Sequence, residues 1–176
     1  LKLRFILPMV MRGLPVPTTK RLYIMRDCKR EADLVGLPFG KTVDPVGVGV
    51  ERAIAVLHHA IPRGKGVAFA IAALEGAFAR GIELASDAGL DEVAARAGIG
   101  ADEARAALAD ESWRPVAEEN RRALFDAGLW GAPTFRVDGG PVLLGESAPA
   151  RLGRLPGGLL LAGRPLRCLL RRPGQG

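Results

Sequence analysis

The chain has 176 residues, which is enough for one domain with a substantial core or for one domain that carries an insertion. Its formal charge of +6 comes from the C-terminal part, because residues 151–176 hold six arginines and no acidic residue. The neutral body argues against a general nucleic-acid surface, since such domains carry a basic face over the fold itself. The arginines of residues 151–176 leave one such function open, namely a basic tail that binds nucleic acid or an anionic membrane.

Cysteine usage and hydropathy set the expected compartment. Cys28 and Cys168 are the two cysteines and form no C-x-x-C pair, so we expect neither a disulfide framework nor a zinc site. The N-terminal LKLRFILPMVMRG lacks the order of a signal peptide, and the longest apolar run, VAFAIAAL, is far below the roughly 20 residues of a membrane span. We therefore expect a cytoplasmic protein without a membrane span.

The first eight residues, LKLRFILP, predict a β-strand. Leu1, Leu3 and Phe5 alternate with Lys2 and Arg4, which is the period of a half-buried strand. The next segment, MVMRGLPVP, contains the glycine and prolines that are typical of a loop.

A helix is predicted after this loop. Thr18 or Thr19 is a plausible N-cap, and the helix runs to about Val35, where Gly36 and Pro38 stop it. One face of this helix carries Tyr23, Asp27 and Arg30, which recur at i, i+4 and i+7. The simplest interpretation of that face is a surface ion pair beside a half-buried tyrosine.

The region of about residues 45–111 predicts a series of helices. The G-x-G in DPVGVGVERAIAVLHHAI follows no strand and lacks a third glycine, so it is no dinucleotide fingerprint. From Gly49 the apolar spacing fits a helix. His58 and His59 are adjacent and so point about 100° apart, which prevents them from facing one metal as an i, i+4 pair does.

An Ala-rich helix follows in GKGVAFAIAALEGAFARG. Its small residues allow close packing against neighbouring helices, so we expect a buried helix of the insertion. Its larger apolar residues form one stripe: Val67, Ile71, Leu74 and Phe78. Two short helices are expected next, one from Asp87 to Gly98 and one in ADEARAALAD. Ser112 is then the expected N-cap of a last long helix, whose first turn tolerates Pro115.

A β-hairpin is predicted in LWGAPTFRVDGGPVLLG, residues 129–145. The strand signals TFRVD and PVLLG flank Gly139-Gly140, and two glycines supply the positive φ of a tight turn. Pro133 stands at the first position of a strand, where its missing N–H is tolerated. Since X-Pro bonds adopt the cis form at modest cost, we predict a cis bond between Ala132 and Pro133.

Two separated segments resemble one protein family. The segment NRRALFDAGLWGAPTF with its hairpin and the following G-E-S resembles the C-terminal half of the DsbA-like thioredoxin family, in its 2-hydroxychromene-2-carboxylate isomerase and kappa-class glutathione transferase branch. Upstream, a P-x-x-K-x-x-Y-x-x-x-D-x-x-R-x-A-x-x-x-G-x-P pattern of that branch is matched by Pro17, Lys20, Tyr23, Asp27, Arg30, Ala32, Gly36 and Pro38.

The resemblance implies an α/β fold, in which a thioredoxin-like sheet carries a large all-helical insertion. It covers residues 1–147, with the insertion at about 45–111, and an irregular Arg/Pro/Gly-rich tail occupies 148–176. The first strand of this chain would be the family's second, so we expect an in-frame strand and helix upstream. That segment would carry the reactive serine or C-x-x-C of the family. The exposed sheet edge would then favour a homodimer.

The resemblance also implies glutathione as cofactor and a set of binding residues. Ala132 and Pro133 would pair with the cysteinyl backbone of glutathione, and Lys20 would lie near the cleft. The family's acid after the last strand binds the γ-glutamyl ammonium, and here Glu146 or Ser147 stands near that position. Because the chain departs from the family's G-S-D there, we expect weaker binding than in an intact relative.

Two functions are compatible with this sequence. The favoured one is a glutathione-dependent isomerase or transferase that acts on a small aromatic or hydrophobic substrate. The alternative is a DsbA-like thiol-disulfide oxidoreductase, or a non-catalytic fragment of either. A serine upstream would indicate the first and a C-x-x-C the second.

Overall fold

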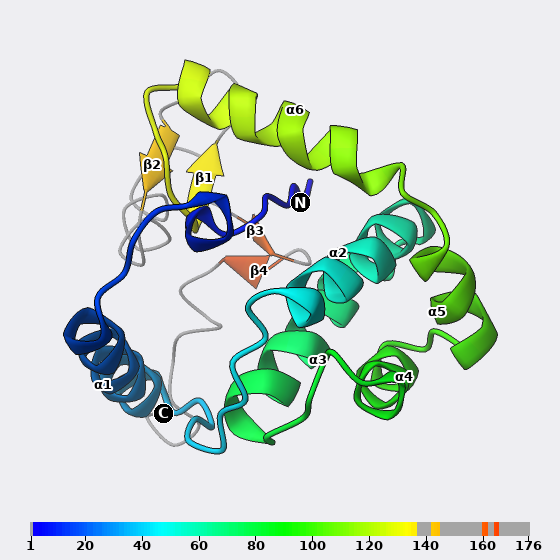
Figure 1. Ribbon diagram of the computed structural model, residues 1–176, viewed down its shortest axis with the longest axis horizontal. Coiled ribbons are helices and arrows are strands. Elements are labelled where there is room, and N and C mark those ends of the chain that lie inside the picture. Colours follow the sequence, from blue (N-terminus) through cyan, green and yellow to red (C-terminus); the bar gives the residue numbers. More distant parts are fainter. Residues whose placement is uncertain (1, 137–141, 145–159, 162–163, 166–176) are drawn as a thin grey trace. The chain divides into compact units, whose positions relative to one another are not determined.

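The computed structural model describes residues 2–136, 142–144, 160–161 and 164–165 (Figure 1). The chain divides into two compact units, which are described separately. Residues 2–120 form the helical unit, and residue 1 with residues 121–176 forms the hairpin unit. Among the described residues there are six α-helices, and none of them is both long enough and apolar enough to cross a bilayer.

The elements follow the order that the sequence predicts from residue 18 onward. The α-helices are α1 Thr18–Val35, α2 Val48–Ala60, α3 Gly66–Ala79, α4 Asp87–Arg96, α5 Ala101–Leu108 and α6 Trp113–Asp126, with 3-10 turns η1 Met9–Arg12 and η2 Ile61–Arg63. The strands are β1 Thr134–Arg136, β2 Val142–Leu144, β3 Leu160–Leu161 and β4 Arg164–Pro165. β3 and β4, which form a short antiparallel ladder, lie in the part predicted to be irregular.

Helices α2 to α5 enclose the main core of the helical unit, as the green and cyan ribbons of Figure 1 show. Its largest fully buried side chains are Val56, Phe69, Leu90, Val93 and Ile99. Alanines fill most of the remaining positions, together with Ile82 and Leu84, as the low aromatic content suggests. A Cβ on Gly76 of α3 would lie 2.7 Å from Cγ1 of Val93 on α4, so the glycine permits the close approach of these two helices.

The small residues of α3 pack closely as expected, but the helix is not buried on all sides. Of its larger stripe only Phe78 packs against the main core. Phe69 is 1% exposed and is buried together with Gly66, Ala72, Ala73, Gly76 and Ala77, whereas Ile71 and Leu74 are each 60% exposed. The small residues face the core because they bring the α3 backbone close to α4 and α2. The larger stripe of Val67, Ile71 and Leu74 remains at the surface of the unit.

A second, smaller core joins α2, α6 and the N-terminal segment. It contains Phe5, Ile54, Ala55, Trp113 and Ala117. Residues 2–8 do not form the predicted strand, although Phe5 is buried as the alternation suggests. A strand needs a neighbouring backbone, and the Phe5 carbonyl instead accepts a hydrogen bond of 3.0 Å from the Asn120 side chain.

The bounds of α1 agree with the prediction except at its cap. The helix begins at Thr18, and Pro17 occupies the N-cap position without a side-chain hydrogen bond, so neither threonine is the cap. Proline suits this place because its fixed φ leads into a helix and the first N–H groups lack acceptors in any case. The helix ends at Gly36, which is left-handed with φ +74°.

The hairpin unit contains the predicted antiparallel pair of strands. β1 pairs with β2 in the register Thr134 to Leu144, Phe135 to Leu143 and Arg136 to Val142. The expected Gly139-Gly140 turn lies outside the described residues. The domain range 1–147 and the insertion at about 45–111 stay predictions. The two compact units are divided after residue 120, which is neither of these predicted boundaries.

Candidate functional site

The end of α6 sets the path of the chain toward the predicted glutathione site. The N–H of Gly128 donates to the Phe125 carbonyl at 2.8 Å, and the N–H of Leu129 donates to the Leu124 carbonyl at 3.1 Å. These two bonds and the φ of +75° at Gly128 form a Schellman cap, which turns the chain sharply at the helix end. Ala132 follows only four residues later.

The Ala132-Pro133 corner leads directly into β1. The bond between the two residues is cis, which confirms the prediction, and both side chains are exposed. The Thr134 hydroxyl donates to the Gly131 carbonyl at 2.6 Å and so holds the corner against the strand. Within the described residues β1 pairs only with β2, so its other edge has no strand beside it. That edge can accept an extended backbone.

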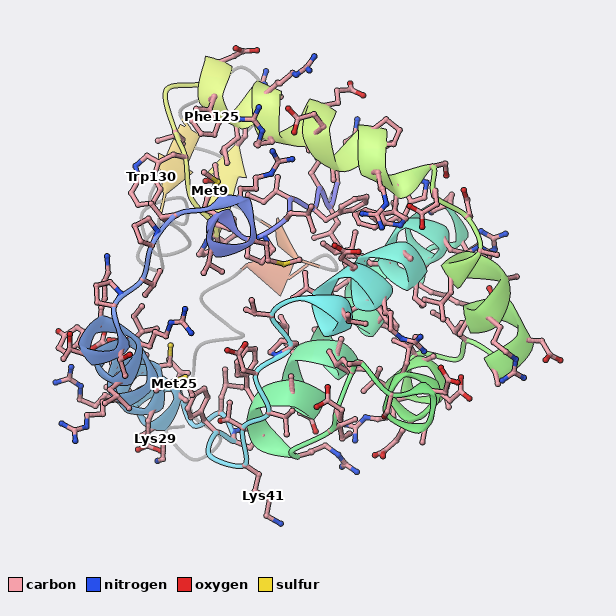
Figure 2. The ribbon with its side chains drawn as sticks, in the orientation of Figure 1. Met9, Met25, Lys29, Lys41, Phe125 and Trp130 are labelled. Carbon is pink, nitrogen blue, oxygen red and sulfur yellow. The ribbon has the colours of Figure 1, made fainter. Side chains whose placement is uncertain are left out.

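Aromatic side chains stand near this corner in the sequence. Trp130 is 58% exposed, and Phe125 is also exposed, with the Arg121 guanidinium carbon 5.1 Å from the centre of its ring. Figure 2 labels both aromatic residues on the hairpin unit. The corner therefore combines exposed residues next to a strand with apolar surface, which suits a peptide-like ligand.

We expect Gly128→Ala to destabilise the hairpin unit by about 1 to 2 kcal/mol, because an L side chain at a left-handed position crowds the following carbonyl oxygen. Urea unfolding followed by circular dichroism measures the change. Gly100→Ala is the matched control, since Gly100 has an ordinary φ of −72° and open space around its Cβ position. A Gly128→Ala protein as stable as this control would contradict the role of the cap.

The structure brings only some of the predicted site residues together. Ala132 and Pro133 are neighbours in the hairpin unit, whereas Lys20 is an exposed residue in the first turn of α1, in the helical unit. Glu146 and Ser147 lie outside the described residues. The roles of Lys20, Glu146 and Ser147 therefore stay predictions.

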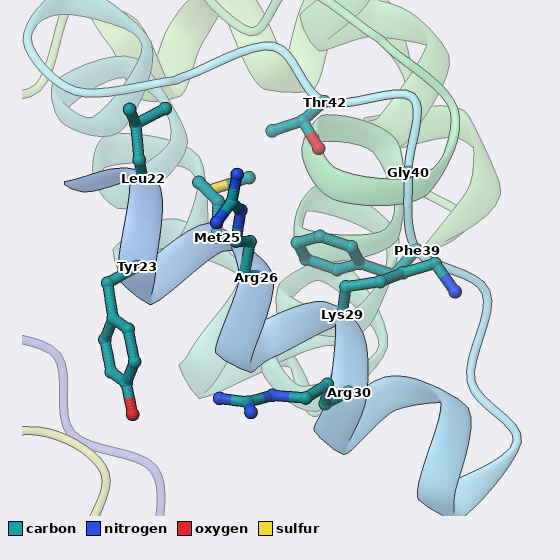
Figure 3. A pocket seen from close by; sticks show the side chains of 9 residues that line it. All are labelled: Leu22, Tyr23, Met25, Arg26, Lys29, Arg30, Phe39, Gly40 and Thr42. Atoms are coloured by element: carbon teal, nitrogen blue, oxygen red, sulfur yellow. The ribbon is translucent and has the colours of Figure 1, made fainter. Parts of the chain in front are cut away.

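A surface groove, which the sequence did not predict, lies between α1 and the segment 39–42 of the helical unit (Figure 3). Its volume is about 800 Å³, within the range of pockets that hold small molecules. Leu22, Met25 and Phe39 give it apolar surface. Three cationic side chains also line it: Arg26, Lys29 and Arg30. We call it the α1 groove.

Two of these cations have acidic partners on α1. Arg30 donates to Asp27 at 2.6 Å, which confirms the predicted pair, and Lys29 pairs with Asp33. The bond to Asp27, together with a smaller effect of Tyr23, raises the pKa of Arg30. Tyr23 is not half-buried as predicted but exposed, and the Arg30 guanidinium carbon is 5.9 Å from the centre of its ring.

His58 and His59 reach different partners at the end of α2. Nε2 of His58 lies 3.1 Å from the Ser112 hydroxyl, and Nε2 of His59 lies 3.2 Å from a Glu103 carboxylate oxygen. Partial burial opposes the charge of Glu103, but Lys65 and hydrogen bonds from His59 and Lys65 outweigh it and lower its pKa. Within the part of the chain that the structure describes, no three metal-binding side chains come together.

Tyr23 and Arg30 of the lining belong to the sequence pattern, but the α1 groove itself was missed, because a groove depends on two segments that are apart in the sequence. One signal was present: α1 carries charged residues on most of its circumference, which is unusual for a helix that packs against a core. Such a helix leaves apolar residues such as Leu22 at the surface. The spacing alone did not show what they face.

Comparison with protein families gives one finding that concerns both the Ala132-Pro133 corner and the α1 groove. The family model of the DSBA-like thioredoxin domain matches residues 7–154. A search among curated proteins finds no match. The matched range includes both segments that carry the resemblance and the Ala132-Pro133 corner.

Proposed function

The chain belongs to the family of DSBA-like thioredoxin domains, and from this we propose that it binds glutathione. Membership in this family supports thiol-disulfide oxidoreductase or related glutathione-dependent activity. In the proposed reaction the protein is an isomerase or transferase of the 2-hydroxychromene-2-carboxylate isomerase and kappa-class type. The thiol of glutathione acts on a small aromatic or hydrophobic substrate in the cytosol.

The observation that carries this proposal is the exposed residue pair Ala132-Pro133 directly before β1. Glutathione is a tripeptide, so its cysteinyl N–H and C=O can pair with a free strand edge as an added strand does. The Ala132-Pro133 corner and the edge of β1 that no other described strand pairs with supply such a place within the hairpin unit. Trp130, exposed two residues earlier, adds apolar surface for the ligand.

The γ-glutamyl end of glutathione needs a carboxylate for its ammonium group. Glu146 is the proposed anchor because it is the only acidic residue between β2 and the arginine-rich tail, with Ser147 as a neutral acceptor. A charge-assisted hydrogen bond contributes roughly 1.5 to 3 kcal/mol, so its loss corresponds to about tenfold to a hundredfold in affinity.

Calorimetric titration with reduced glutathione tests the proposal, with Glu146→Gln as the variant. We expect binding to the unaltered chain and a decrease of about tenfold to a hundredfold in affinity for Glu146→Gln. Cysteinylglycine, which lacks the γ-glutamyl group, is the matched ligand, and the variant should bind it as the unaltered chain does.

The outcomes separate the two parts of the proposal. Absence of glutathione binding would reject the glutathione function and favour the oxidoreductase alternative. Normal binding that Glu146→Gln leaves unchanged would reject only the anchor and leave the Ala132 contact in place.

A further inference from the structure

We propose that the α1 groove is a binding site for a small anion with an elongated apolar body, of the class of medium-chain carboxylates. This site lies in the helical unit and is formed by α1 and by the segment 39–42 that α3 holds in place. It does not rest on the proposed glutathione function.

One wall of the α1 groove is fixed by contacts with α3. The N–H of Gly40 donates to the Phe78 carbonyl at 3.0 Å, and the N–H of Val43 donates to the Ala77 carbonyl at 2.8 Å. The rings of Phe39 and Phe78 stack, with centroids 6.2 Å apart and planes 4° from parallel. Phe39 is thus a held apolar surface and not a side chain free to fill the groove.

The other wall is one face of α1. Leu22, Met25, Arg26 and Lys29 recur at i, i+3, i+4 and i+7, so they follow the helix axis over about 10 Å. Figure 3 shows the side chains of Met25 and Arg26 extending toward the segment that holds Phe39 and Thr42, whereas Tyr23 points away from it. A wall of this shape fits an elongated ligand, and the flexible Met25 can adapt to an alkyl chain.

The charge of the groove determines the head group. Lys29 and Arg30 are each balanced by an acid on α1, but within the described part of the chain Arg26 makes no ion pair or hydrogen bond. The lining with its acidic partners therefore keeps one positive charge beside apolar side chains. A guanidinium suits a carboxylate because its N–H groups can donate two parallel hydrogen bonds.

Octanoate is the probe, and octan-1-ol is the neutral molecule with the same chain. Titration of the 15N-labelled protein, followed by amide shifts, gives the affinity and the place of binding. We expect shifts in residues 22–30 and 39–42, and affinity for octanoate about fivefold higher than for octanol, as for an exposed ion pair of about 1 kcal/mol. Added salt should reduce the difference.

Variants of two arginines on the same helix complete the experiment. Arg26→Gln should remove the preference for octanoate, and Arg26→Lys should keep most of it. Arg21→Gln should change nothing, because the Arg21 side chain donates to the Val16 carbonyl and does not line the groove. Equal affinity for octanoate and octanol, an unchanged preference in Arg26→Gln, or no shift in these segments would overturn the proposal.

Discussion

Replacing Phe69 with Ala should lower the free energy of unfolding by about 3 to 5 kcal/mol, because the ring is 1% exposed in the main core and its loss leaves a cavity. The packing of α3 on α4 leaves little room for the neighbours to close that cavity, since Gly76 already brings the two helices into contact. Urea unfolding followed by circular dichroism measures the change.

Ile71→Ala is the matched control on the same helix. Ile71 is 60% exposed, so its truncation should change the free energy of unfolding by no more than about 0.5 kcal/mol. The comparison decides which face of α3 is buried. A large loss for Ile71→Ala with a small loss for Phe69→Ala would contradict the structure.

Replacing Trp113 with Ala should also cost about 3 to 5 kcal/mol. The indole is 2% exposed and packs in the second core with Phe5, Ile54 and Ala117, and the Arg114 guanidinium carbon lies 4.3 Å from the centre of its ring. The loss therefore affects α6, α2 and the N-terminal segment together. Unfolding followed by circular dichroism gives the size of the effect.

Trp130→Ala is the control for this change, because Trp130 is the second of the two tryptophans and is 58% exposed. Its effect on stability should stay within about 0.5 kcal/mol. Each single variant keeps one tryptophan, so the Trp130→Ala protein should emit from a buried indole and the Trp113→Ala protein from a solvated one. Similar emission maxima in the two proteins would contradict the assigned burial.

The helix bounds could be predicted from sequence because their signals are local. α1 ends before Gly36, and the chain leaves α4 through Gly98, as expected. The N-cap of α4 is Ser86, which was not predicted and whose side chain accepts a hydrogen bond from the N–H of Gly89. Local signals do not say which side of an apolar helix is covered. On α3 both sides are apolar, and the choice depends on how closely α4 can approach Gly76.

The N-terminal segment shows the limit of strand prediction. The alternation around Phe5 correctly indicates one buried residue, but a strand forms only beside another backbone, which the pattern of LKLRFILP does not contain. The hairpin of β1 and β2 was predictable because its two strands are joined by a short connection.

The two candidate sites differ in the same way. The Ala132-Pro133 corner is a matter of neighbouring residues, so the sequence indicates it directly. The α1 groove requires Arg26 on one segment and Phe39 on another, held in place by Phe78 of α3. That arrangement is a result of tertiary packing, which no spacing within α1 reveals.

Amide shifts of the 15N-labelled chain during titration with reduced glutathione test the central claim most directly. We predict that the amides of Gly131, Ala132 and Thr134, which flank the proline, shift the most and saturate together with the calorimetric binding. Saturable glutathione binding that leaves these three amides unchanged would contradict the proposed site at Ala132.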